Sequence, residues 1–127
     1  MPFTRIALPG GKNAAFRQTL STLLHQTLVD FFDVPQDDCF QLFDEYAPGL
    51  RVFPRHYPGG PRSEGFLWSL TTAGRPRSVV QTPRFYRPPS HRLSSQLQGR
   101  PEDVTVTSTS SPPDAWSFAT GHGLAAT

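Results

Sequence analysis

The chain has 127 residues, of which 36% are hydrophobic and 17% charged, and this fits a single domain over 1–127 with a modest core. Twelve basic and ten acidic residues give a net charge of +2 without any basic cluster, so we expect no nucleic-acid partner. No apolar run approaches the roughly 20 residues that span a bilayer, and no signal segment is recognisable. We expect a cytoplasmic protein with no membrane partner.

The first unit, residues 1–47, is predicted to be a strand, a helix and a strand. A short strand covers 3–8 and ends at a Pro-Gly-Gly turn. Apolar residues then recur at spacings of three and four from Phe16 to Phe32, which predicts an amphipathic helix that stops before Pro35. A second strand is predicted over 39–46, and Cys39, the only cysteine, is expected to pack as a small apolar side chain. Such a unit is parallel and right-handed.

A loop over residues 48–65 follows, with four prolines, four glycines and three arginines. A loop of this length in a compact domain is either functional or mobile. The second unit, 66–109, begins with residues that alternate between two faces up to Ala73, which predicts a half-buried strand ended by Gly74. A helix pattern over 77–97 is interrupted by Pro83, Pro88 and Pro89, so we expect it to be broken or kinked. A strand over 104–108 and a tail over 110–127 complete the chain.

The two units resemble each other, because a Pro-acidic turn precedes the last strand of each, over 34–38 and over 100–104. We therefore predict an α/β (α+β) fold made by internal duplication. It consists of two βαβ units in a four-stranded mixed sheet, with two helices on one face.

Polar and aromatic residues are predicted to converge at one edge of this sheet. If the two units are antiparallel, the starts of the first two strands and the ends of the last two reach the same edge. That edge then gathers an amine, a carboxylate, two guanidinium groups and two aromatic rings. The residues are Pro2, Asp38, Arg75, Arg77, Trp116 and Phe118. Each alone has an ordinary structural explanation, but together they describe a small apolar-walled pocket for a carboxylate substrate.

These residues carry a resemblance to a known family. The leading Pro2, the segments VPQDD, GRPRS, PEDV and DAWSF, and their spacing resemble the tautomerase superfamily and, within it, the malonate semialdehyde decarboxylases. The similarity covers nearly the whole chain. It implies a duplicated βαβ fold, a catalytic amino-terminal proline and a homotrimer.

The resemblance implies a decarboxylase of a small 3-oxo acid, with hydratase activity open to the same groups. Pro2, Asp38, Arg75 and Arg77 would be catalytic, and both arginines would bind substrate together with Trp116 and Phe118. Two alternatives stay open, namely a keto–enol tautomerase of the phenylpyruvate type and a catalytically silent binding relative. We expect no cofactor. No metal is expected either, because the histidines lack partners at metal-ligand spacing.

Overall fold

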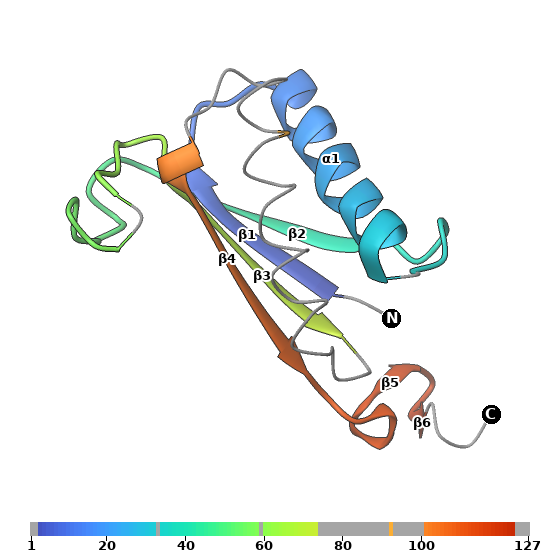
Figure 1. The fold of residues 1–127 in the computed structure, drawn as a ribbon. Helices are drawn as coiled ribbons and strands as arrows, with labels where there is room; N and C mark the ends of the chain where they lie inside the picture. The colour runs from blue at the N-terminus through green and yellow to red at the C-terminus, as the bar shows by residue number, and fades with distance from the viewer. Residues whose placement is uncertain (1–2, 33, 59, 74–91, 93–100, 124–127) are drawn as a thin grey trace.

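The structure is a computed structural model that describes residues 3–32, 34–58, 60–73, 92 and 101–123. One long helix lies across one face of a four-stranded sheet, and a small hairpin lies beyond the end of the last long strand (Figure 1). The elements are β1 (Phe3–Pro9), α1 (Ala14–Phe32), β2 (Phe40–Tyr46), β3 (Leu67–Ala73), β4 (Val104–Ser110), β5 (Ser117–Ala119) and β6 (His122–Gly123), with single 3₁₀ turns at Pro101–Asp103 and Pro113–Ala115.

The sheet has the predicted mixed topology, in the order β2-β1-β3-β4. β1 pairs in parallel with β2, β3 pairs in parallel with β4, and β1 and β3 are antiparallel neighbours that join the two units. The fold prediction is therefore confirmed for the sheet and its first helix. The second predicted helix, over 77–97, lies outside the described residues apart from Arg92.

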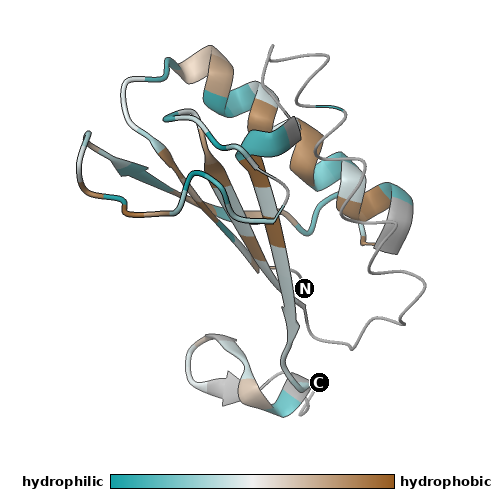
Figure 2. Cartoon of the chain, turned by 60° about the vertical axis from the view of Figure 1, so that its left-hand side comes forward, coloured by the Kyte–Doolittle hydropathy of each residue, from teal (hydrophilic) through white to brown (hydrophobic). Residues whose placement is uncertain are grey.

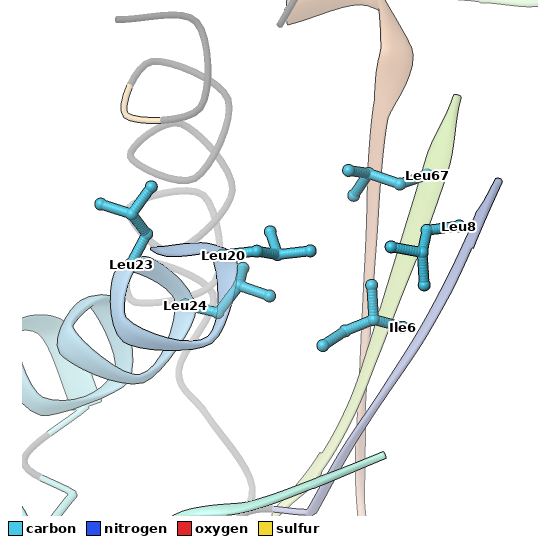
Figure 3. Packing of buried hydrophobic residues seen from close by; sticks show 6 residues of the cluster. All are labelled: Ile6, Leu8, Leu20, Leu23, Leu24 and Leu67. Atoms are coloured by element: carbon cyan, nitrogen blue, oxygen red, sulfur yellow. The ribbon is translucent and has the colours of Figure 1, made fainter. Parts of the chain in front are cut away.

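α1 forms where the apolar spacing predicted it. Asn13 caps its first turn, because the Asn13 Oδ1 atom accepts a hydrogen bond of 2.8 Å from the Phe16 backbone N–H. Its inner face carries leucines that meet apolar residues of β1 and β3 in one buried cluster, and Figure 3 shows Leu20 and Leu24 directed toward the strands. The six are Ile6, Leu8, Leu20, Leu23, Leu24 and Leu67.

Alternation along the strands gives the sheet two unlike faces, and apolar and polar residues appear as bands along the chain in Figure 2. Toward α1, Ile6 and Leu8 are fully buried, and the hydroxyls of Thr4 and Thr71 share a buried hydrogen bond of 3.0 Å. On the other face, which we call the open face, Trp68 remains 48% exposed. The period of two in β3 is thus confirmed, and α1 covers the face that carries Leu67, Ser69 and Thr71.

One expectation about the first unit is wrong. Cys39 is exposed instead of packed, and it lies one residue before β2, an edge strand of the sheet. No helix in the described part of the chain is long and apolar enough to cross a bilayer.

Candidate active site

The strand register brings four strand ends to one edge of the sheet. Phe3, the first residue of β1, pairs with Phe40 at the start of β2 and with Thr72 near the end of β3. Thr72 in turn pairs with Thr109 of β4. We call this edge the site edge, and Figure 1 shows the described amino end of the chain and the β5–β6 hairpin at the same end of the molecule. The predicted arrangement of the strands is therefore present.

Three of the residues predicted for this edge lie outside the described residues, namely Pro2, Arg75 and Arg77. The structure describes their chain neighbours instead. Phe3 follows Pro2 directly, and Ala73 ends β3 two residues before Arg75. β1 therefore begins and β3 ends at the site edge, so Pro2 precedes and Arg75 follows the paired strands in the sequence.

Asp38 is the predicted catalytic residue whose surroundings the structure gives. It closes a turn in which its backbone N–H donates 3.0 Å to the Pro35 carbonyl, and β2 begins two residues later. The Gln36 carbonyl within this turn lies 2.7 Å from Nε2 of His25 on α1. Asp38 itself is half-buried at the start of the edge strand.

The aromatic residues follow β4 in a compact segment. A 3₁₀ turn at Pro113–Ala115 reverses the chain, and half-buried Trp116 comes directly after it. Phe118 lies on β5, and its side chain is outside the description. Thr120 and Gly121, with φ of 59° and 78°, make the tight two-residue turn into β6. The hairpin therefore lies beyond the end of β4, at the same end of the molecule as the site edge.

At the opposite end of the sheet, which we call the loop end, sequence reasoning missed a cavity of about 680 Å³. Its floor is the open face at Ala7, Trp68 and Thr105, and its walls come from the loop between β2 and β3. Aromatic and arginine residues recur along this loop, and this pattern was the only indication of the cavity in the sequence. Their contacts, however, could not be read from the sequence.

The arginines of this loop bind the loop itself. Arg51 donates to the Phe66 carbonyl and, at 3.1 Å, to the Glu64 carbonyl, and its guanidinium lies 5.5 Å from the Phe53 ring centre. Burial lowers the pKa of the Arg51 guanidinium from its ordinary value, and the Glu64 carboxylate opposes this shift. Arg51 is therefore a structural cation that holds the two ends of the loop together.

Arg62 and Arg55 have the same kind of partners. Arg62 donates 3.0 Å to the Tyr57 carbonyl and 2.8 Å to the Pro58 carbonyl. Arg55 pairs with the Glu64 carboxylate and reaches the Arg62 carbonyl at 3.5 Å. The terminal nitrogens of these arginines thus donate to acceptors of the same loop, and these hydrogen bonds cross-link the loop.

A buried carboxylate ties this scaffold to the second unit. Asp103, just before β4, accepts hydrogen bonds from the Ser63 backbone N–H at 2.6 Å and from the Ser63 hydroxyl at 2.5 Å. The same hydroxyl accepts from the Gly65 N–H at 3.1 Å. Within the described ranges, His, Cys, Asp and Glu side chains form no group of three that could hold a metal ion.

Comparison with known proteins gives concordant matches. A family model described as "Tautomerase enzyme" matches residues 38–119. The "Probable tautomerase YusQ" of Bacillus subtilis (strain 168) is 30% identical over 122 residues, which cover 96% of each chain.

Solved structures agree in fold. A crystal structure of malonate semialdehyde decarboxylase superposes with a TM-score of 0.86 at 28% identity, over 94% of this chain and 92% of that one. A fused 4-OT, described as a symmetric trimer, superposes with a TM-score of 0.73 over 98% and 97% of the two chains. At 18% identity the second match concerns the fold alone.

Proposed function

The chain belongs to the tautomerase family, and from this premise we propose that it decarboxylates a small 3-oxo acid of the malonate semialdehyde type. The observation that carries the proposal is the match to malonate semialdehyde decarboxylase, at 28% identity over nearly the whole chain. The segments GRPRS and DAWSF and the leading Pro2 support it, because they supply the groups that this reaction needs.

Decarboxylation of a 3-oxo acid requires that the carboxylate be held out of the plane of the carbonyl group. The bond between the α-carbon and the carboxylate carbon then breaks, CO2 leaves, and the bonding electrons pass to the carbonyl oxygen as an enolate. We assign the first task to Arg75 and Arg77. Two guanidinium groups separated by a rigid proline suit bidentate binding of one carboxylate.

We assign the second task, activation of the carbonyl, to the Pro2 amine after removal of Met1. A cationic secondary amine donates a hydrogen bond to the carbonyl oxygen and stabilises the enolate, which then takes a proton at carbon to give the aldehyde. A neutral amine would instead attack the carbonyl and form an iminium. Asp38 would favour the cation and raise the amine pKa, whereas Arg75 and Arg77 would lower it.

Trp116 and Phe118 complete the proposed pocket as apolar walls. Half-buried Trp116 lies directly after the 3₁₀ turn, and the β5–β6 hairpin follows it in the chain. Aromatic walls exclude water, and a drier site strengthens each contact between a charged group and the substrate.

Keto–enol tautomerisation is the second candidate, because the relative at 30% identity is named a probable tautomerase. In this reaction the Pro2 amine would be neutral and act as a base that moves a proton between carbon and oxygen. The carboxylate of the substrate would still need Arg75 and Arg77, but no carbon–carbon bond would break.

One paired assay separates the candidates. Protein whose intact mass shows loss of Met1 is given 3-oxopropanoate, with CO2 release as the readout, and the enol of phenylpyruvate, with ketonisation as the readout. We expect a higher kcat/KM for CO2 release. A higher value for ketonisation would favour the tautomerase, and no turnover of either acid by the processed protein would point to the silent relative.

A control with Met1 retained tests the assigned amine. In that chain the Pro2 nitrogen is an amide, which neither carries a useful proton nor forms an iminium. We expect the retained form to be nearly inactive although both forms fold alike. Equal rates for the two forms would remove Pro2 from the mechanism.

We further propose that this single-domain chain works as a homotrimer that covers the open face. Apolar side chains remain about half exposed there, with Phe40 at 49%, Leu42 at 52% and Trp68 at 48%. An exposed face of this kind at the surface of a small domain marks an interface. The trimeric fused 4-OT shows that the fold supports such an assembly.

Light scattering on a matched pair of variants tests the trimer. Leu42→Asp places a charge on the open face and should shift the mass toward the monomer, because the carboxylate would be buried at the interface. Thr22→Asp, at an exposed position of α1, should leave the mass unchanged. A monomeric parent protein at micromolar concentration would contradict the proposal.

A further inference from the structure

Two hydrogen bonds join one face of α1 to the chain before and after Asp38. Figure 1 shows the turn that carries Asp38 between α1 and β2. His25 Nε2 meets the Gln36 carbonyl at 2.7 Å, before Asp38 in the chain. Gln41 Nε2 donates 3.2 Å to the Ser21 carbonyl, after Asp38. Ser21 and His25 are four residues apart and thus lie on one helix face. The chain is therefore joined to α1 on both sides of Asp38, before it by the Gln36 carbonyl and after it by the Gln41 side chain.

His25 supplies the bond nearest to the turn. Its residue is only 7% exposed, and the partner is a carbonyl oxygen, so Nε2 must carry the hydrogen and donate it. A buried donor without a partner is costly, which means that ring and turn hold each other in place. The charged groups nearest along this turn are Asp37 and Asp38, and neither is the hydrogen-bond partner of Nε2.

The neighbouring anchor of the same turn is apolar. Val34 is 5% exposed and packs with Leu28 of α1 in a small second cluster. It fixes where the chain leaves the helix, but it lies four residues before Asp38. Gln36 is only two residues before Asp38 in the chain, and its carbonyl is hydrogen-bonded to the imidazole of His25. The last part of the turn is therefore held by the His25 side chain together with the bond from the Asp38 N–H to the Pro35 carbonyl.

We propose that His25 is a positioning residue, which acts through the Gln36 carbonyl to hold the Asp38 carboxylate at the distance from the amino-terminal amine that sets the proton affinity of that amine. This inference rests on the proposed function, because it takes Asp38 and Pro2 as partners. It adds a residue of α1 that touches no reacting atom.

The test measures the pKa of the Pro2 amine directly, by NMR on processed protein whose prolines carry a nitrogen isotope. Only the amino-terminal proline nitrogen titrates, so turnover is not required. Asp38→Asn should lower this pKa by roughly one unit, because it removes the anion that favours the cationic amine. His25→Leu should lower it in the same direction by at least about half as much.

Two further variants show that the shift passes through Asp38. His25→Gln keeps a side-chain N–H donor at the position of Nε2 and should stay within about 0.3 unit of the parent value. The double variant with His25→Leu and Asp38→Asn should show no larger shift than Asp38→Asn alone, because residues that act through one another are not additive. Leu24→Val, a change in the core of α1, should lower the melting temperature without moving the amine pKa.

The outcomes separate the inference from the proposed function. An amine pKa that moves in Asp38→Asn but not in His25→Leu would overturn the positioning role and leave the site assignment intact. If Asp38→Asn does not move it either, the assigned partnership of Pro2 and Asp38 fails, and the inference fails with it. If the variants show the expected shifts in the amine pKa but the parent protein turns over neither test acid, the positioning role stands and the proposed function is wrong.

Discussion

Both ends of the sheet have arginines close by in the sequence, and the structure gives the hydrogen-bond partners of those at the loop end. At the loop end, Arg51 and Arg62 use their terminal nitrogens on backbone carbonyls of their own loop. At the site edge, the strand register gathers four strand ends, and the pair assigned to substrate, Arg75 and Arg77, follows β3 directly. Arginine content alone therefore does not identify an anion site. At the loop end, protein acceptors already take donors of these arginines.

The largest expected effect is the loss of activity at the site edge. Arg75→Ala or Arg77→Ala removes a charge-assisted hydrogen bond worth about 1.5–3 kcal/mol, so kcat/KM for 3-oxopropanoate should fall roughly tenfold to over a hundredfold. The melting temperature should change little. Arg17→Ala, which removes a partly buried arginine of α1 paired with Glu45, serves as the control. Parental kinetics in both site variants would remove the carboxylate clamp.

The mirror-image experiment is Arg51→Ala at the loop end. It leaves the carbonyls of Glu64 and Phe66 without their donor, so the free energy of unfolding should fall by about 2 kcal/mol while kcat/KM per folded molecule stays unchanged. Arg51→Lys should recover only part of the loss, since an ammonium group lacks the planar fork. Urea denaturation gives the free energies of unfolding. A drop in kcat/KM without a drop in stability would contradict the structural role of Arg51.

A smaller stability effect is expected where the loop end meets β4. Asp103→Ala removes the acceptor of both Ser63 bonds, and the free energy of unfolding should fall by about 1–2 kcal/mol. Limited proteolysis should then cut the chain between Arg55 and Ser63 faster than in the parent protein. Ser63→Ala keeps the backbone bond to Asp103, so its rate of proteolysis should lie between those of the parent protein and Asp103→Ala. A rate in Asp103→Ala equal to that of the parent would contradict the assigned role of Asp103.

The smallest effect is expected midway between the ends, on the open face. Arg5 Nε lies 3.0 Å from the Asp44 carboxylate, and this hydrogen bond raises the pKa of the Arg5 guanidinium. Both side chains are partly solvated, and exposed ion pairs contribute little. Asp44→Asn should therefore shift the melting temperature of a monomeric form by less than about 2 °C. A larger shift that appears only in the assembled form would indicate that a second copy covers this pair.

The sequence predicted the sheet and α1 well because both depend on regular spacing. Leucines at spacings of three and four define α1, and the alternation around Trp68 defines β3. The loop end was not predictable in the same way. Arg51 finds its acceptors 13 and 15 residues away, and such contacts depend on the path of the loop rather than on any period in the sequence.

The arrangement of the strand ends at the site edge was predictable, whereas the assignment of catalytic and binding residues there stays a prediction. Opposite directions of the two units suffice to bring the ends of β3 and β4 to the start of β1, and the register has this form. His25 escaped sequence reasoning because a histidine on an amphipathic helix gives no sign of its partner. Cys39 was misjudged because strand propensity does not reveal whether a residue lies just before an edge strand.

The central place of β1 in the sheet bears on how the chain folds as it leaves the ribosome. β1 is synthesised first, yet its neighbour on one side is β3, and the hydroxyl pair that links the two strands joins residues 67 positions apart. The unit from β1 to β2 is complete much earlier, while the other edge of β1 still waits for its partner. An open strand edge invites pairing with another nascent chain. Slower synthesis of the segment before β3 should therefore increase aggregation in the cell without altering the finished protein.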